Sequence, residues 1–168
     1  MSSSVEAAWE AIAAQATGHV KDQPDYVVAS MQKNGDLELI ETGHGGAANG
    51  GGRGAVLKCM KANEDKVLVG VFKVTGVDHR ETTVSFRSKF IHFVYKGTSA
   101  GVMLKAKVGV NTTKITEPFT GAHLFIKSDG DESDFDQDEI SRQLFAIGGA
   151  HKPTKYDFNN EYEDELED

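Results

Sequence analysis

The chain has 168 residues, of which 39% are hydrophobic and 26% charged, and a formal net charge of −8. This length suits one domain that closes a core without disulfides or metal. Because no apolar run nears the roughly 20 residues of a membrane span, and the first residues lack the basic head and apolar centre of a signal peptide, we expect a soluble, cytoplasmic protein. We also expect a monomer.

The negative charge is concentrated near residue 168. Six acidic residues and no basic residue lie between Glu161 and Asp168, which leaves 20 acidic and 18 basic residues in the rest of the chain. A segment with such dense like charge buries little apolar surface. We therefore interpret residues 1–150 as a single domain and residues 151–168 as an acidic, disordered tail.

The first expected element is an amphipathic helix. Ser3 and Glu6 have the spacing of a capping box, and the apolar residues between Val5 and Ala16 recur at helical spacing. Gly18 stands where the helix should end. Residues 26–31 and 37–40 then follow as a pair of strand-length runs around Lys-Asn-Gly-Asp, which predicts a hairpin.

Residues 43–54 form a glycine-rich segment. A phosphate-binding P-loop would end in Gly-Lys-Ser or Gly-Lys-Thr, which is absent here, and the related Gly-x-Gly-x-x-Gly turn would need a glycine at Ala48. We interpret the segment as a mobile surface loop inserted in the domain. A nucleotide-binding enzyme that uses this loop is kept as an alternative.

The middle of the chain predicts the interior of the sheet. Residues 55–62 suit a short helix, in which the lone Cys59 is interpreted as a buried small hydrophobe. Residues 67–74 and 86–95 are almost continuously apolar, which is typical of strands that are buried on both faces. We expect them side by side, joined by a polar connection over residues 75–83.

The last third predicts two helices around a strand. Residues 102–107 suit a short helix, Pro118 interrupts any helix through residues 112–117, and residues 122–126 suit the last strand. A final helix begins with Asp136 as N-cap and ends at Gly148-Gly149. Its expected buried stripe consists of Ile140, Leu144 and Ile147. This order of elements indicates an α/β or α+β fold of three layers, with a mixed sheet between helices.

The strongest functional signal is a window of positive charge. Between Thr82 and Thr116 the chain has six basic residues and no acidic residue: Arg87, Lys89, Lys96, Lys105, Lys107 and Lys114. The window predicts a positive face and an acidic partner, for which an acidic phospholipid is one option. Nucleic acid is not expected, because the aromatic residues of the window lie in an apolar run that suits a core better than a base-stacking surface.

We expect no catalytic activity, no cofactor and no metal. The six histidines are dispersed without ligand spacing. The acidic run of residues 129–134 fails the calcium-loop pattern, because Asp134 stands where a glycine is needed and Ile140 where a bidentate glutamate is needed. No nucleophile stands in a recognisable catalytic turn.

Three short motifs occur in a recognisable order. Arg87-Ser88-Lys89-Phe90 leads into an aromatic strand, Lys105-Ala106-Lys107 follows a short turn, and Gly148-Gly149-Ala150 ends the final helix with Tyr156-Asp157 beyond it. Together they resemble coactosin-like proteins of the actin-depolymerising-factor homology (ADF-H) superfamily. Residues 119–149 are also similar to the cofilin branch, so the superfamily is better supported than the branch.

The resemblance extends from about Lys66 to Asp157. It implies a mixed sheet of five or six strands between helices, no catalysis, and location at the actin cytoskeleton. It further implies binding to the side of actin filaments, in preference to monomers, without severing. The alternative is a cofilin-like protein that binds monomers and severs filaments. By position, the expected actin-binding residues are Arg87, Lys89, Lys105 and Lys107, with Lys89 the most closely tied to filaments, and Lys96 and Lys114 belong to the same basic window.

Some residues depart from the family pattern. Phe145-Ala146-Ile147 stands where family members carry lysines, which predicts weaker binding. Pro118 and Gly121 interrupt the region of the long actin-binding helix of cofilins, which argues against severing. The serines at positions 2–4 resemble the regulatory serine of cofilins, although a helix cap explains Ser3 equally well.

Overall fold

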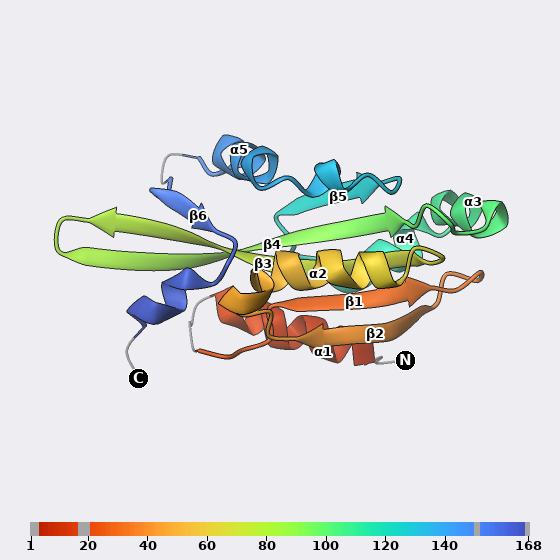
Figure 1. Cartoon of the computed structure of the whole chain (residues 1–168), viewed down its shortest axis with the longest axis horizontal. Helices are drawn as coiled ribbons and strands as arrows, with labels where there is room; N and C mark the ends of the chain where they lie inside the picture. The colour runs from red at the N-terminus through yellow and green to blue at the C-terminus, as the bar shows by residue number, and fades with distance from the viewer. Residues whose placement is uncertain (1–3, 17–20, 150–151, 167–168) are drawn as a thin grey trace.

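The structure, a computed structural model, describes residues 4–16, 21–149 and 152–166. In these ranges a mixed six-stranded sheet lies between layers of helices (Figure 1), which confirms the expected fold class. The strands are β1 (Tyr26–Met31), β2 (Leu37–Gly43), β3 (Val67–Arg80), β4 (Thr83–Lys96), β5 (Leu124–Ser128) and β6 (Lys155–Asp157). The α-helices are α1 (Ser4–Ala13), α2 (Gly51–Ala62), α3 (Val102–Val110), α4 (Thr112–Thr116) and α5 (Gln137–Ile147). The 3-10 helices are η1 (Ala14–Ala16), η2 (Ala47–Asn49), η3 (Glu117–Phe119), η4 (Glu132–Phe135) and η5 (Glu161–Glu165). None of the helices in the described ranges has both the length and the apolar character of a membrane span.

The sheet is built around the long β3–β4 hairpin. Its strand order is β2-β1-β3-β4-β5, and β6 pairs with β3 beyond the stretch that pairs with β1. All pairs are antiparallel except β4 and β5. The outer part of the β3–β4 hairpin extends as a two-stranded arm past the rest of the sheet (Figure 1).

Each face of the sheet has its own core. One cluster joins the sheet to α2 and α5, and includes Cys59, Phe72 and Phe93. The other joins the sheet to α1, α3, α4 and η3, and includes Trp9 and Phe119. Strands with helices on both sides are apolar at successive positions, which explains the continuous apolar runs in β3 and β4. The prediction that Cys59 is buried is confirmed.

Several predicted elements form where local signals placed them. The first helix, the hairpin of β1 and β2, the short helix that starts at Val102 and the break around Pro118 are all present. Asp136 is the N-cap of α5, and its Oδ2 accepts a hydrogen bond from the backbone N of Glu139 at 3.1 Å. The expected cap at Ser3, the stop at Gly18 and the serines at positions 2 and 3 fall outside the described residues.

The expected polar connection over residues 75–83 is wrong. β3 continues to Arg80 and β4 begins at Thr83, so the strands are joined by a turn at Glu81 and Thr82. Polar side chains are compatible with this arm because its outermost residues, from His79 to Ser85, are exposed while the backbone ladder continues. Ile147 was also placed wrongly, since its side chain is 56% exposed at the end of α5.

The glycine-rich segment is not a mobile surface loop. It ends β2, forms η2 and supplies the first turn of α2, where Gly51 and Gly52 are buried. A Cβ atom on Gly51 would lie 1.9 Å from the carbonyl O of Phe158, and one on Gly52 would lie 2.5 Å from the carbonyl O of Asp25. The glycines therefore allow close packing, and do not form an open loop that could wrap around a phosphate.

The expectation of a disordered tail is wrong for residues 152–166. β6 pairs with β3, and the side chains of Phe158 and Tyr162 are buried. The OH of Tyr162 accepts a hydrogen bond from Lys73 Nζ at 2.7 Å, and Asn160 Nδ2 donates to the buried carboxylate of Asp25. A few apolar and amide groups anchor this segment, although four of the six residues 161–166 are acidic.

Candidate functional site

The six basic residues of the window lie on three elements. Arg87, Lys89 and Lys96 are on β4, Lys105 and Lys107 are on α3, and Lys114 is on α4. The stretch of β4 from Lys89 to Lys96 spans about 23 Å at about 3.3 Å per residue, and α3 lies beyond the end of β4 (Figure 1). The structure therefore separates the window into two places, and does not gather it into one patch.

The first place, the strand site, consists of Arg87 and Lys89. Both side chains lie on one face of β4, because residues at alternate positions of a strand share a face. Arg87 is exposed and Lys89 half-buried. Among the described residues, neither has a carboxylate within ion-pair distance. Since no acid neutralises them, these cations are available to an acidic partner.

His123 holds the backbone beside the strand site. Its Nδ1 accepts a hydrogen bond from the backbone N of Phe90 at 2.9 Å, and its own backbone N donates to the carbonyl O of Phe90 at 2.9 Å. Burial, followed by the charge of Lys89, lowers the pKa of His123. The ring therefore favours the neutral form that can accept from Phe90, which keeps β4 fixed next to Lys89.

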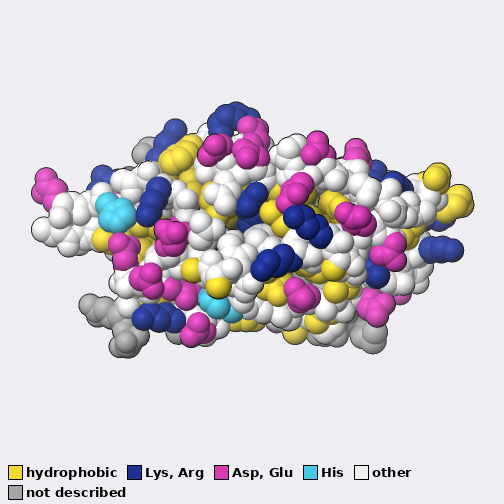
Figure 2. All heavy atoms as spheres, viewed as in Figure 1, with side chains coloured by type: hydrophobic (Ala, Val, Ile, Leu, Met, Phe, Trp, Pro, Cys, Tyr) yellow, Lys and Arg dark blue, Asp and Glu magenta, His cyan; other side chains and the backbone are white. Residues whose placement is uncertain are grey.

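The second place, the α3 site, combines charge with exposed apolar surface. Val102, Met103 and Val110 are 82%, 68% and 81% exposed, whereas Val108 is the buried residue of this helix. Lys105 and Lys107 lie between them in sequence and are half-buried. Figure 2 shows hydrophobic and basic side chains together at the end of the molecule that α3 forms. Exposed apolar residues clustered on one element are typical of an interaction surface.

Lys96 and Lys114 are engaged within the chain. Lys96 Nζ lies 3.6 Å from Asp129 Oδ1. Lys114 Nζ lies 2.7 Å from Asp36 Oδ1 and donates to the carbonyl O of Asn34 at 3.0 Å. These two lysines are therefore less available to a partner than Arg87 and Lys89.

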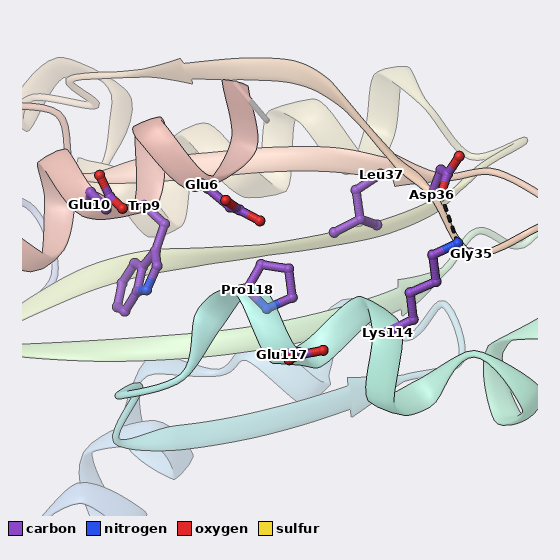
Figure 3. Close-up of a pocket in the computed structure, with 9 residues that line it drawn as sticks. All are labelled: Glu6, Trp9, Glu10, Gly35, Asp36, Leu37, Lys114, Glu117 and Pro118. Carbon is purple, nitrogen blue, oxygen red and sulfur yellow. Dashed lines mark ion pairs between the residues drawn. The ribbon is translucent and has the colours of Figure 1, made fainter. Parts of the chain in front are cut away.

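Lys114 also faces an acidic groove. The groove has a volume of about 670 Å³ and runs between α1, the β1–β2 turn and the segment from α4 to η3 (Figure 3). Its lining includes four acidic side chains, which are Glu6, Glu10, Asp36 and Glu117. This groove interrupts the positive face that the linear charge pattern predicted.

Sequence reasoning missed the apolar part of the α3 site. The sequence contained a signal for this apolar surface, because apolar residues occupy both ends of a short helix. Only one face of a surface helix packs against the core, so some of these residues must be exposed. The exposed Ile147 at the end of α5 is a further apolar surface residue, whereas the nearby Phe145 packs its ring against Tyr156 at a centroid distance of 4.7 Å.

No protein-family model and no curated protein matches the sequence. The structure is similar to solved structures. Mouse coactosin, described as an actin filament binding protein, has 18% identity and a TM-score of 0.56 over 86% of this chain and 90% of that chain. The ADF-like UNC-60A protein of Caenorhabditis elegans has 15% identity and a TM-score of 0.57 over 88% of this chain and 94% of that chain. The cofilin homology domain of the yeast actin-binding protein ABP1P has 20% identity and a TM-score of 0.53 over 81% of this chain and 87% of that chain. The chain therefore has the ADF-H fold, as the resemblance implied.

Proposed function

We propose that the chain, which has the ADF-H fold, binds the side of actin filaments and modulates their dynamics without severing them. The observation that carries the proposal is the strand site, where Arg87 and Lys89 present unneutralised charge at the positions that the family resemblance indicates. Actin-binding proteins among the similar structures support actin as the partner. On this proposal the protein acts at the actin cytoskeleton of the cytoplasm.

The two sites should contribute differently to binding. Burying a Val or Met side chain fully is worth about 1.5–3 kcal/mol, whereas an exposed ion pair is worth about 0.2–1 kcal/mol. Val102 and Met103 of the α3 site would therefore supply more affinity per residue than the lysines. The cations of the strand site would mainly set the association rate and its dependence on salt.

The interrupted helix region supports the proposal that filaments are not severed. α3 ends at Val110, α4 covers only Thr112–Thr116, and Pro118 lies in η3. The chain thus has no single long helix over residues 102–119, where the resemblance places the long actin-binding helix of cofilins. A cofilin-like activity would shorten filaments under the microscope. The proposal expects unchanged filament lengths at saturating protein.

Co-sedimentation with filamentous actin tests the strand site. The double variant Arg87→Ala and Lys89→Ala should pellet less than wild type at low salt and show a weaker salt dependence. The double variant Lys58→Ala and Lys155→Ala is the matched control, because it also removes two positive charges, from exposed lysines on α2 and β6. If the double variant pellets like wild type at every salt concentration, the assignment of the strand site is wrong.

Met103→Ser tests the α3 site separately. It should weaken binding about tenfold or more, since about 1.4 kcal/mol corresponds to a factor of ten in affinity, and leave the salt dependence unchanged. Because Met103 is exposed, the variant should unfold at the same urea concentration as wild type. Undiminished binding by Met103→Ser would show that α3 does not contact the filament.

A further inference from the structure

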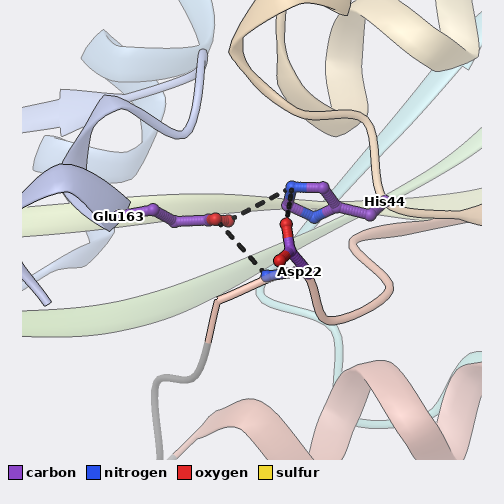
Figure 4. A group of neighbouring side chains, drawn as sticks. All are labelled: Asp22, His44 and Glu163. Atoms are coloured by element: carbon purple, nitrogen blue, oxygen red, sulfur yellow. Dashed lines mark hydrogen bonds and ion pairs between the residues drawn. The ribbon is translucent and has the colours of Figure 1, made fainter. Parts of the chain in front are cut away.

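Three polar side chains from distant parts of the sequence meet beside the docked C-terminal segment. Asp22 precedes β1, His44 follows β2 and Glu163 lies in η5 (Figure 4). His44 Nε2 is 3.7 Å from Asp22 Oδ1 and 3.5 Å from Glu163 Oε1. One ligand atom from each residue lies within 4.8 Å of the others.

The neighbours of His44 indicate which of its ring nitrogens carries a proton. Its Nδ1 lies 2.9 Å from the carbonyl O of Gln23 and 3.6 Å from Asp25 Oδ2. Both neighbours are acceptors, so Nδ1 carries the proton and donates to Gln23. Nε2 therefore faces the carboxylates of Asp22 and Glu163. A cation bound between the three groups, or a proton on Nε2, would stabilise this arrangement.

We propose that Asp22, His44 and Glu163 bind a divalent transition-metal cation of the zinc type. Zinc bonds of about 2.0–2.1 Å in a tetrahedral site place neighbouring ligand atoms about 3.3–3.4 Å apart. The two distances from His44 Nε2 exceed this spacing by only a few tenths of an ångström. Three protein ligands leave the fourth position of the tetrahedron to water.

The surroundings of His44 match a second feature of metal sites. A metal-binding histidine usually donates its other ring N–H to a carbonyl or carboxylate, which fixes the ring orientation. Gln23 supplies that carbonyl and the buried Asp25 a carboxylate. The imidazole ligand also favours zinc over Mg²⁺ and Ca²⁺, which prefer oxygen ligands.

Lys73, a buried cation of the described chain, does not replace the metal. Burial lowers the pKa of Lys73, and the charges of Asp25 and Glu163 oppose this shift. However, its Nζ donates to Gln15 Oε1 at 2.8 Å and to Tyr162 OH at 2.7 Å. The ammonium group is thus held by neutral oxygens beside the proposed site.

A metal at this position would join three segments. It would connect the segment before β1, the glycine-rich segment after β2 and η5, and so strengthen the docking of residues 155–166. This inference does not depend on actin binding.

Calorimetric titration of the full chain, after treatment with a chelator, tests the proposal at pH 7.5. We expect one Zn²⁺ per chain and no saturable binding of Mg²⁺. At a Zn²⁺ concentration of about 100 times Kd, the Tm should rise by about 5–10 °C. Hydrogen exchange of residues 155–166 should slow when Zn²⁺ is added, which adventitious surface binding would not cause.

Two variants remove a ligand with little other change. His44→Asn keeps a donor toward Gln23, and Asp22→Asn suits the positive φ of 62° at this exposed position. Both should weaken Zn²⁺ binding at least tenfold. His79→Asn is the matched control, because His79 Nε2 lies 3.5 Å from Glu165 Oε1 in the same region but meets only one carboxylate. The proposal is overturned if wild type binds no Zn²⁺, or if His44→Asn binds it as tightly as wild type.

Discussion

Replacing Phe158 by Ala tests whether the acidic segment near the end of the chain is part of the fold. The side chain of Phe158 is 5% exposed and packs in the cluster of α2, α5 and the sheet. Truncating a buried Phe to Ala costs about 3–5 kcal/mol, out of a total unfolding free energy of about 5–15 kcal/mol. With a urea m-value of about 2 kcal/mol per M, the unfolding midpoint should fall by about 1.5–2.5 M.

Urea unfolding followed by the fluorescence of Trp9 measures this change. Trp9 is the single tryptophan and packs against Phe90 on the opposite face of the sheet, so it reports global unfolding. Glu161→Ala, an exposed residue of the same segment, is the control and should change stability by less than about 0.5 kcal/mol. A midpoint for Phe158→Ala within about 0.3 M of wild type would refute the docked segment.

Three further predictions follow from buried positions. Gly51→Ala should destabilise the fold by about 1–3 kcal/mol in urea unfolding, because φ at Gly51 is +70° and the added Cβ would overlap the carbonyl O of Phe158. Gly109→Ala is the control, because Gly109 lies in open space on α3, and it should leave stability unchanged or raise it. Burial raises the pKa of Cys59 to about 11, so a thiol reagent should react much more slowly at pH 8 with the folded chain than with the chain in urea, and equal rates would contradict the burial. Burial also lowers the pKa of His92 below 6.5. As pH falls, His92 is therefore protonated in the unfolded chain before it is protonated in the folded chain. The stability that the neutral His92 contributes is present above pH 6.5 and is lost as pH falls through the folded pKa. His92→Asn should flatten the dependence of the unfolding free energy on pH between pH 7 and 5, and an unchanged slope would contradict this.

Local sequence rules predicted the elements whose signals lie within a few residues. The β1–β2 hairpin follows from its turn residues, and the start of α5 follows from Asp136 and Glu139. These features depend on nearby backbone groups, so a single sequence is enough to place them.

Two of the wrong predictions, those for the glycine-rich segment and for the last segment, share a physical cause, because contacts between residues far apart in the sequence decide them. The glycine-rich segment looked mobile, but residues 51 and 52 need to be glycine because Phe158 and Asp25 pack against them. The last segment looked disordered because its many acidic residues hide the small number of buried residues, such as Tyr162, that hold it against the domain. The basic window could be read from the sequence, but not its division between the strand site and the α3 site, which the direction of β4 determines.

The most direct test of the proposed function is co-sedimentation of the wild-type chain with filamentous actin over a salt series, with binding to actin monomers measured in parallel. The proposal predicts pelleting that weakens as salt rises, because exposed cations are screened, and little or no binding to monomers. Absence of pelleting at low salt would contradict filament binding. Tight monomer binding would contradict the preference for filaments.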